Sequence, residues 1–483
     1  MEQLVYNTLA NKKEVFKTLE PGKVKLYLCG PTVYDYLHIG NFRGPIVFNM
    51  IRNWLEFTGY DVTFAYNYTD VDDKIIKKAQ AENVDSRVIS ERYIKAFEED
   101  FNNLKLKPHE FNPKVTDHID AIIELIEGIL KNGKAYEIDG EVFFSINDFE
   151  TYGGLSKKKL DDLEAGSRVE VDSRKRNPHD FVLWKPSKEN EPAWDSPWGK
   201  GRPGWHIECS AMVKAIFGDS IDIHGGGIDL IFPHHENEIA QSEACNCTKY
   251  CNYWIHNEFI SMGDEKMSKS LGNVITANNF MKTYDGEVLK FLYLNAHYRS
   301  RLSVTDEKIR QSVSALYRVY SAKNLAEQVI EKIEATAVES KNFSKELKAF
   351  EDKISESMHD DFNTAETISV VFEATRLFNS SLTKKRKSVE DKAIAQSYLK
   401  FLDSYGQILA LFCEDSSSYL DSLDEMILSL NSISKSEVEK LLADRNEARN
   451  NKKWEQSDLI RDQLAQLGVE VLDGSAKGWR SKV

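Results

Sequence analysis

Hydrophobic and polar residues along the front of the chain follow the order strand, helix, strand. Residues 24–29 (VKLYLC) form a short apolar run typical of a buried strand, and residues 61–70 (DVTFAYNYTD) alternate like a second strand. Between them, apolar residues recur at helical spacing: Val47, Met50, Ile51, Trp54 and Leu55. This order predicts a parallel strand pair with a right-handed crossover, the start of a doubly wound parallel, Rossmann-like α/β sheet.

Two later segments extend the predicted sheet. Residues 221–227 (IDIHGGG) and 253–260 (YWIHNEFI) are typical of strands, and they flank a helix that begins near Pro233. Residues 115–203 are rich in loops. We therefore expect a sheet domain made of residues 1–114 and 204–260 and split by an insertion at 115–203.

The rear half of the chain has the pattern of long helices. All eleven prolines lie at or before Pro233, so no proline interrupts a helix beyond that point. One helical stripe is formed by Ile309, Val313, Leu316 and Tyr320. Residues 305–425 are predicted to be an α-helical bundle, and residues 426–483 a small separate module with two short helices.

Composition and charge narrow the class of protein. The 483 residues are 41% apolar and 29% charged, as in soluble globular proteins of about three domains. No apolar run approaches the ~18 residues of a membrane span, and the first residues lack the layout of a signal peptide. We expect a cytoplasmic protein whose six cysteines are reduced. The net charge of −14 argues against nonspecific coating of nucleic acid but allows a local basic surface for one structured RNA.

A first candidate for phosphate binding is YLCGPTVYDYLHIGN, residues 27–41. The chain leaves a strand, turns at Gly30-Pro31 and enters a helix just past Gly40. His38 and Asn41 would then lie at a helix N-terminus, where free N–H groups favour a phosphate. Taken alone, these residues are better explained by a plain structural turn.

A second candidate is EKMSKSLGN, residues 265–273. Lys266 and Lys269, with the small Ser268 between them and Ser270 after them, are typical of a mobile loop that closes on a polyphosphate and stabilises a departing pyrophosphate. A solvated lysine loop is the alternative. No Walker-type P-loop sequence is present.

Taken together, these motifs resemble the two signatures of class I aminoacyl-tRNA synthetases. The segments CGPTVYDYLHIGN, TDVDDKII, GRPGWHIECSAM, DIHGGGIDLIFPHHENEIAQSEA and EKMSKSLGN are similar, in order and approximate spacing, to the cysteinyl-tRNA synthetase family. The resemblance covers essentially the whole chain. One departure is Asn41, where the first signature usually ends in histidine; an asparagine can still donate a hydrogen bond to a phosphate oxygen.

The segment FPHHENEIA contains metal-ligand residue types. His234 and Glu238 stand four residues apart and share one helix face, while His235 and Glu236 point elsewhere. Zinc-peptidase spacings are absent, so further ligands must come from other segments. Cys29 and Cys209 are candidates because strand ends of a doubly wound sheet converge, although each could be a buried small hydrophobe.

The family resemblance implies one Zn²⁺ per chain held by a four-residue set: Cys29, Cys209, His234 and Glu238. Zinc prefers sulfur and lowers the pKa of a thiol, so it would select cysteine over serine without an editing domain. A competing zinc knuckle in ACNCTKYC is a weak signal because its three cysteines (Cys245, Cys247 and Cys251) have no obvious fourth ligand.

The resemblance also assigns the other site residues. The amino-acid pocket would contain Gly30, Thr69, Trp205 and Asp229, although Trp205 could be a core residue and Asp229 a helix-start acid. Mg²⁺ would accompany ATP, whose binding residues would be His38, Gly40, Asn41, Gly225, Gly226, Gly227 and Lys269. The residues of catalysis would be His38, Asn41, Lys266 and Lys269, and residues 261–304 would carry the lysine loop and a stem-contact region.

For the RNA partner, residues 426–483 are expected to form an anticodon-binding module. Basic side chains meet phosphates, and aromatic or arginine side chains stack on unpaired bases. Candidates are Arg445, Arg449, Lys452, Lys453, Trp479 and Arg480. Acidic residues are interleaved with them, so a solvated mixed-charge helix is the alternative.

The implied function is activation of L-cysteine by ATP to cysteinyl-adenylate and its transfer to the 3′ end of tRNA-Cys by a monomer that contacts no membrane. Three alternatives remain open on sequence. One is a cysteine ligase on the same catalytic core with an amino-sugar acceptor, which would not need an anticodon module. The others are a zinc-dependent hydrolase and a noncatalytic zinc- and RNA-binding protein, and both leave the lysine loop unexplained.

Overall fold

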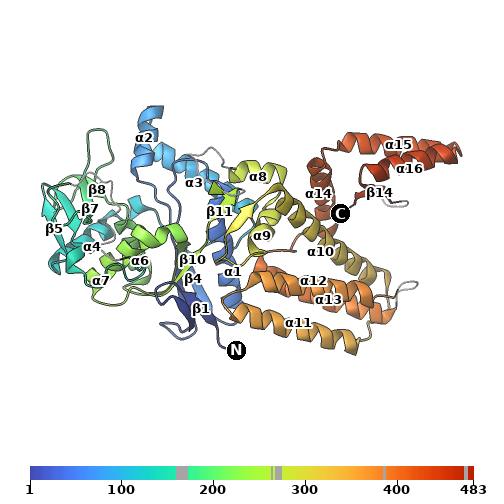
Figure 1. Ribbon diagram of the computed structural model, residues 1–483, viewed down its shortest axis with the longest axis horizontal. Coiled ribbons are helices and arrows are strands. Elements are labelled where there is room, and N and C mark those ends of the chain that lie inside the picture. The colour runs from blue at the N-terminus through green and yellow to red at the C-terminus, as the bar shows by residue number, and fades with distance from the viewer. Residues whose placement is uncertain (159–171, 263–264, 267–274, 384–387, 473–476, 483) are drawn as a thin grey trace. The chain divides into compact units, whose positions relative to one another are not determined.

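The computed structural model describes residues 1–158, 172–262, 265–266, 275–383, 388–472 and 477–482 (Figure 1). The chain divides into two compact units. The first comprises Met1–Phe280, Ala296–Ser303 and Glu356–Thr364, and the second Met281–Asn295, Val304–Ser355 and Ala365–Val483.

The first unit is built on a four-stranded parallel sheet in the order β10-β9-β3-β4. Its strands are β3 (Lys23–Leu28), β4 (Asp61–Tyr66), β9 (Ile221–Gly227) and β10 (Cys251–Asn257). Helix α1 (Arg43–Phe57) links β3 to β4 and buries Ile51, Trp54 and Leu55, as the helical spacing predicts. The doubly wound parallel sheet is thereby confirmed.

The strand register places one edge of this sheet at a common level. Leu28, the last residue of β3, is opposite Tyr66 on β4 and Gly225 on β9. The residues that follow these strands therefore converge, as the carboxyl ends of parallel strands do in doubly wound folds. Cys29 is the first residue beyond β3 at this edge.

Several elements surround the sheet. Helices α2 (Asp73–Glu82) and α3 (Ser86–Asn103) begin where Asp72 and Asp85 accept hydrogen bonds from backbone N–H groups two residues on. Further elements of this part are β1 (Leu4–Asn7), β2 (Lys12–Val15), α6 (Ile207–Phe217), α7 (Glu236–Asn246), β11 (Ile260–Met262), β12 (Glu265–Lys266), α8 (Ala277–Thr283) and β13 (Leu302–Val304).

The insertion contains an antiparallel sheet in the order β5-β6-β7-β8, beside helix α4 (Ile119–Lys131) (Figure 1). Its strands are β5 (Ala135–Ile138), β6 (Glu141–Phe144), β7 (Phe181–Pro186) and β8 (Gly201–Pro203). Phe144, Leu183 and Trp184 from these strands belong to one buried apolar cluster with Ile207 and Ala240 of the helices next to the parallel sheet. The insertion therefore shares its core with the elements that carry the site.

The second unit is helical, and its chain ends in a small α/β part. The helices are α9 (Gly286–Leu294), α10 (Asp306–Lys332), α11 (Lys341–His359), α12 (Thr364–Ser381), α13 (Val389–Leu409) and α14 (Ser416–Leu430). The final part pairs α15 (Lys435–Asn450) with α16 (Trp454–Gln466) and adds the hairpin β14 (Val469–Val471) and β15 (Trp479–Ser481) (Figure 1). Its small core includes Val438, Leu442, Leu464 and Trp479.

In the described part of the chain, no helix is both long enough and apolar enough to cross a membrane.

Candidate functional site

Four side chains from three separate segments meet at the carboxyl edge of the parallel sheet. Cys29 follows β3, Cys209 lies on α6, and His234 and Glu238 lie in and after the turn that leads into α7. Their ligand atoms all lie within 4.8 Å of one another. Cys29 Sγ is 3.6 Å from Cys209 Sγ and 3.3 Å from Glu238 Oε1, and His234 Nε2 is 3.0 Å from the same oxygen.

The local backbone explains how His234 and Glu238 come together. A short helical turn, Ile231–His235, precedes α7, and Phe232 within it has extended backbone angles. His234 and Glu238 are four residues apart, so on a helix they lie on the same face, and His234 Nε2 is 3.0 Å from the Glu238 carboxylate. The spacing of His234 and Glu238 in the sequence thus brings these two side chains together as expected. Cys29 and Cys209 are brought next to them by the tertiary structure.

Electrostatics in the cluster favour charged groups despite their burial. Burial opposes ionisation of Glu238, but His224 and His234 outweigh it and hold the pKa of that carboxyl well below its usual range. Burial also opposes the charged form of His234, but the Glu238 carboxylate outweighs it and raises the pKa of the imidazole to about 10. A hydrogen bond from Cys29 lowers the pKa of Cys209 to about 6, although burial opposes this shift. Burial and the neighbouring Cys209 raise the pKa of the Cys29 thiol.

This donor set fits a zinc ion. Two sulfurs, one imidazole nitrogen and one carboxylate oxygen are the ligand types that zinc takes in proteins. A cation at their centre would replace the protons that the imidazole and thiol otherwise hold. Among the described residues, the two groupings suited to a metal both lie at this cluster, and neither contains Cys245, Cys247 or Cys251.

Residues that sequence reasoning missed surround Glu238. Its Oε2 lies 2.8 Å from His224 Nε2 and accepts a hydrogen bond of 3.1 Å from the Tyr250 hydroxyl, while Oε1 faces Cys29 and His234. One carboxylate oxygen is thus fixed by the protein and the other is aimed at the cluster. The signal available in the sequence was His224, a titratable residue near the carboxyl end of the predicted strand IDIHGGG.

The expectation that His235 points away from the cluster is wrong. His235 Nε2 lies 3.4 Å from Cys29 Sγ, and its Nδ1 lies 2.8 Å from His256 Nε2. Cys29, His224, His235 and Glu238 form the second grouping with metal-ligand geometry. Consecutive residues of a helix point about 100° apart, and the two histidines accordingly reach different members of the cluster: His234 contacts Glu238 and His235 contacts Cys29.

Glu236, the other charged residue of the segment, serves the fold. Its carboxylate accepts backbone hydrogen bonds from Gly153 (2.9 Å), Leu155 (3.3 Å) and Ser156 (2.8 Å) in the insertion. The start of α7 is thereby attached to the insertion, which fixes the turn that carries His234.

The candidate amino-acid residues lie at different distances from the cluster. The Trp205 ring centroid is 4.7 Å from that of His234, and residue Trp205 is 43% exposed. Trp205 lines a cavity of about 410 Å³ together with His206, Phe232 and Asn237. A partly exposed aromatic ring over a buried ligand cluster is suited to contact a small substrate rather than to fill the core.

Gly30 and Thr69 lie beside the cluster, and Asp229 lies on the surface. Gly30 donates its N–H to Asn67 Oδ1 (2.8 Å), and a Cβ atom at Gly30 would approach the Asn67 carbonyl oxygen to 1.6 Å, so only glycine fits there. Thr69 is buried and pairs through its backbone with Thr32. Asp229 is exposed in the 3₁₀ turn Ile228–Leu230.

The glycines after His224 have a packing role. A Cβ at Gly225 would lie 2.1 Å from the Phe48 ring, and one at Gly226 would lie 2.6 Å from the His235 ring. The room that a side chain would need at these two positions is already taken by protein atoms. Gly227 is half-buried, and its missing side chain leaves room for Asp229.

The first signature forms a 3₁₀ turn, Ile39–Phe42, directly before α1. Asn41 Oδ1 accepts the His38 backbone N–H (3.0 Å), so the oxygen of this amide is used locally. Ile39 N–H donates to the Ile275 carbonyl (3.0 Å), which brings the residues after the lysine loop next to the turn. Gly40 and both candidate phosphate ligands are half-buried at this point.

The second signature is described only at its start. The backbone of Lys266 is paired with Ser261 in the short β11–β12 ladder. Lys269 lies outside the described residues.

Two of the candidate RNA-binding side chains are buried. Trp479 is 2% exposed and belongs to the core of the final α/β part, and Arg445 is 6% exposed, so neither offers its side chain to a partner in this structure. Lys452, Lys453 and Arg480 are exposed, and Arg449 is half-buried. Arg480 pairs with Glu470 at 2.6 Å.

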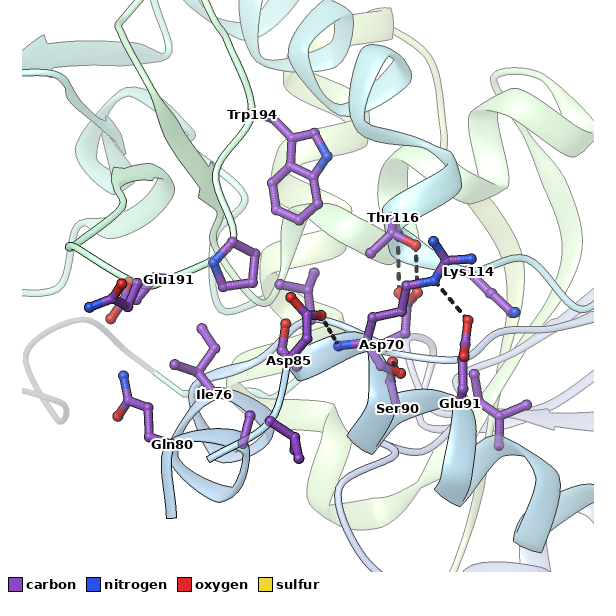
Figure 2. Close-up of a pocket in the computed structure, with 18 of the residues that line it drawn as sticks. Asp70, Ile76, Gln80, Asp85, Ser90, Glu91, Lys114, Thr116, Glu191 and Trp194 are labelled. Carbon is purple, nitrogen blue, oxygen red and sulfur yellow. Dashed lines mark hydrogen bonds and ion pairs between the residues drawn. The ribbon is translucent and has the colours of Figure 1, made fainter. Parts of the chain in front are cut away.

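Another cavity, of about 760 Å³, contains none of the four cluster residues. Figure 2 shows it between α2, α3 and the insertion, with Trp194 on one side. Asp70 accepts hydrogen bonds from the Thr116 hydroxyl (2.6 Å) and N–H (3.1 Å), and Asp85 caps α3. Asp70 and Asp85 are thus engaged within the protein, and we assign the cavity no ligand.

Three family models match the chain. The tRNA synthetases class I (C) catalytic domain matches residues 15–314, the DALR domain residues 353–413, and the Cysteinyl-tRNA ligase anticodon binding domain residues 435–479.

Similar proteins cover the chain over its length. A cysteine–tRNA ligase of Bdellovibrio bacteriovorus is 48% identical over 472 residues, 97% of each chain. A cysteine–tRNA ligase of Clostridioides difficile is 44% identical, over 99% of each chain. Among solved structures, a Mycobacterium tuberculosis methionyl-tRNA synthetase with methionyl-adenylate has a TM-score of 0.60 at 14% identity, covering 86% of this chain and 94% of that one, which shows a shared fold.

Proposed function

This chain belongs to the cysteinyl-tRNA synthetase family of class I aminoacyl-tRNA synthetases, and from that premise we propose that it joins L-cysteine to tRNA-Cys in an ATP-dependent ligase reaction. The observation that carries the proposal is the cluster of Cys29, Cys209, His234 and Glu238 beneath the exposed Trp205 ring. The alternative of an amino-sugar acceptor has no support, because an anticodon-binding domain model matches residues 435–479.

Selection of the substrate rests on the metal cluster. A Zn²⁺ ion held by Cys29, Cys209, His234 and Glu238 would bind the sulfur of the incoming cysteine and favour its thiolate form. Serine offers only an alcohol oxygen, a poorer ligand for a zinc ion that already has sulfur ligands. Trp205 would cover the bound side chain, and Gly30, Thr69 and Asp229 would contact its backbone groups.

Activation of cysteine takes place on ATP with Mg²⁺. The cysteine carboxylate attacks the α-phosphorus, the bond to the β-phosphate oxygen breaks, and cysteinyl-adenylate and pyrophosphate result. His38 and Asn41 would hold phosphates at the 3₁₀ turn before α1, with Gly40 and the segment 225–227 beside the nucleotide. Lys266 and Lys269 would stabilise the charge that develops on the departing pyrophosphate.

Transfer then forms the ester with tRNA. A terminal ribose hydroxyl attacks the adenylate carbonyl and AMP leaves. The C-terminal part would read the anticodon through the half-buried Arg449 and the exposed Lys452, Lys453 and Arg480. We further propose that the protein works in the cytoplasm as a monomer.

The test is ATP–pyrophosphate exchange that depends on cysteine, followed by transfer to a tRNA-Cys transcript. We expect exchange with cysteine at least about a hundredfold faster than with serine at equal concentration, because a zinc ion with thiolate ligands binds a thiolate in preference to an alcohol oxygen. Equal exchange with both amino acids would refute selection by the cluster, and exchange without transfer would refute the tRNA acceptor.

The lysine loop has its own readout in the same assay. Lys269→Ala should depress the rate of adenylate formation by roughly a hundredfold or more while leaving cysteine binding near its original value, because the lysine acts on charge that appears only in the transition state. Equal losses in binding and rate would contradict this role.

A further inference from the structure

Arg43 is the first residue of α1 and directly follows the turn Ile39–Phe42. It is 0% exposed, so its guanidinium group lies inside the protein. A buried cation at the N-terminus of a helix is disfavoured, because burial removes its water and the helix dipole is positive at that end. An arginine in this place therefore needs strong compensating contacts.

The contacts of Arg43 are carbonyl oxygens of two segments far away in the sequence. Its Nη1 donates to the Glu258 carbonyl (2.7 Å) and the Phe259 carbonyl (2.9 Å). Its Nη2 donates to the Ser300 carbonyl (2.6 Å) and the His297 carbonyl (3.4 Å). A planar guanidinium group can hold four backbone carbonyls at once because its donors are arranged in a fixed fork. Arg43 thus joins the start of α1 to both segments.

These two segments lead into the strands on which the lysine loop begins. Phe259 directly precedes β11, whose partner β12 contains Lys266. The turn at 297–300 precedes β13, the other neighbour of β11. The Leu302 N–H donates to the Phe259 carbonyl (3.2 Å), so one oxygen that Arg43 binds also takes part in this small sheet. The guanidinium group therefore ties the strands under Lys266 to the start of α1.

Asp361 secures the turn at 297–300 from another side. It is 0% exposed and accepts hydrogen bonds from the Tyr298 hydroxyl (2.7 Å) and Arg299 Nε (2.8 Å). Its Oδ1 also accepts a backbone N–H of β1 (2.8 Å). The turn whose carbonyls Arg43 binds is thus itself held in place by side chains.

The later end of the lysine loop is attached to the first signature by backbone hydrogen bonds. The Ile39 N–H donates to the Ile275 carbonyl (3.0 Å), and the Ala277 N–H donates to the Leu37 carbonyl (2.9 Å). The described residues on both sides of the loop therefore contact the first signature, on the earlier side through Arg43.

We propose that Arg43 is a positioning residue for adenylate formation. It holds the strands under Lys266 at a fixed place relative to the turn before α1, and Asp361 supports it by securing the turn at 297–300. Charge on a departing pyrophosphate is stabilised best by donors already in place, and a displacement of about 1 Å can cost roughly a hundredfold in rate. The metal cluster contains none of these residues, so cysteine binding should not depend on them. The inference rests on the proposed function, because it takes Lys266 to act on pyrophosphate.

The test measures cysteine-dependent ATP–pyrophosphate exchange with full-length Arg43→Lys protein. Lysine keeps the charge but offers one ammonium group, which cannot reach four carbonyl oxygens. We expect kcat to fall roughly tenfold or more and the KM for cysteine to stay within about twofold of wild type, because the lost geometry matters only in the transition state. An unchanged kcat would overturn the inference, as would a loss of kcat/KM that lies entirely in KM.

Arg52→Lys is the matched control. Arg52 lies on the same helix and is also 0% exposed, but it donates to the Pro108 carbonyl (2.7 Å) and pairs with Glu56 and Glu110. Thermal unfolding of both variants measures the structural cost of losing a buried guanidinium group. The kcat of folded Arg52→Lys should stay near wild type. An equal loss of kcat in the two variants would show a general effect of buried arginines and overturn the assignment to Arg43.

A double-variant cycle gives a readout that a loss of stability does not move. In a Lys266→Ala background, Arg43→Lys should lower kcat by less than about threefold further, because the lysine that Arg43 positions is already absent. The same fold-loss in both backgrounds would mean that Arg43 acts independently of Lys266, which would overturn the inference.

Asp361→Asn decides the question if Arg43→Lys does not fold. Asparagine keeps the size of the side chain but loses the charge that pairs with Arg299, so we expect a smaller loss of kcat, roughly two- to fivefold, at an unchanged KM for cysteine. A wild-type kcat in Asp361→Asn would overturn the inference. Absence of cysteine-dependent exchange in the wild type would refute the proposed function instead.

Discussion

Two buried carboxylates, one in each unit, show how similar burial leads to different chemistry. Glu238 in the first unit is 0% exposed and Glu287 in the second is 4% exposed. Glu238 is surrounded by His224, His234 and two cysteines. Glu287 accepts hydrogen bonds from the Tyr320 hydroxyl (2.7 Å) and the Phe412 N–H (2.7 Å).

The surroundings decide the protonation of each acid. Burial opposes the charge of Glu238, but His224 and His234 keep its pKa well below the usual range. Burial raises the pKa of Glu287 to about 7, because Lys290 and Tyr320 offset only part of that effect. The Glu287 carboxyl group is hydrogen-bonded by neutral donors and has a structural role. At Glu238, by contrast, several possible metal ligands lie close to one carboxylate oxygen beside a cavity. Convergence of ligands, rather than burial, therefore distinguishes the candidate site.

The largest expected effect is loss of the metal. Cys209→Ala should lower zinc content from about one per chain to well below that and abolish most cysteine-dependent exchange, because the three remaining ligands cannot complete a tetrahedral site. Elemental analysis of the purified protein measures the metal directly.

Cys251→Ala is the control for this experiment. Cys251 is also buried, at 2% exposure, but lies on β10 outside the cluster. If Cys209→Ala kept a full zinc complement, the cluster around Glu238 would not be the metal site. Glu238 and Glu287 would then no longer differ in the role proposed for them.

An intermediate effect is expected at the hydrogen-bond partners of Glu238. His224→Gln should weaken zinc binding by roughly 10–100-fold, because outer partners orient a ligand without touching the metal. Competition with a chelator measures the affinity, and Tyr250→Phe, which removes the weaker 3.1 Å hydrogen bond to the same oxygen, should have a smaller effect in the same assay. Wild-type affinity in His224→Gln would show that Glu238 needs no such support.

The smallest effect on the metal site is expected from a change in the second unit, whose consequence is for stability instead. A folded-state pKa of about 7 lies above the ordinary value of 4.5, so Glu287 contributes stability at low pH that is lost as pH rises through about 7. This loss amounts to about 3 kcal/mol between pH 4.5 and pH 8. Glu287→Gln should remove that pH dependence, as measured by urea unfolding of the full chain at pH 5 and pH 8.

The variant also has an outcome that would contradict the comparison. Glu287→Gln is expected to keep its zinc, because residue 287 lies outside the metal cluster. An unchanged pH dependence of unfolding in this variant would mean that Glu287 is ionised like Glu238, and the two carboxylates would then differ only in their ligands.

Much of the fold could be predicted because its signals are local. Alternation in residues 61–70 and helical spacing around Trp54 depend on neighbours in the chain, and both elements form where expected. The spacing of His234 and Glu238 is also local, since four residues make about one helical turn. The position of Cys29 followed from the rule that strand ends converge at one edge.

The rest required the tertiary structure. His224 and His235 join the cluster through a strand register and a turn of irregular geometry, and neither can be deduced from residue spacing. The burial of Trp479 and the four carbonyl contacts of Arg43 depend on how helices, strands and a hairpin pack. By itself the sequence determined the helices, the strands and the ligand types, because those follow from short-range chemistry. Which side chains face one another was decided only by packing between segments hundreds of residues apart.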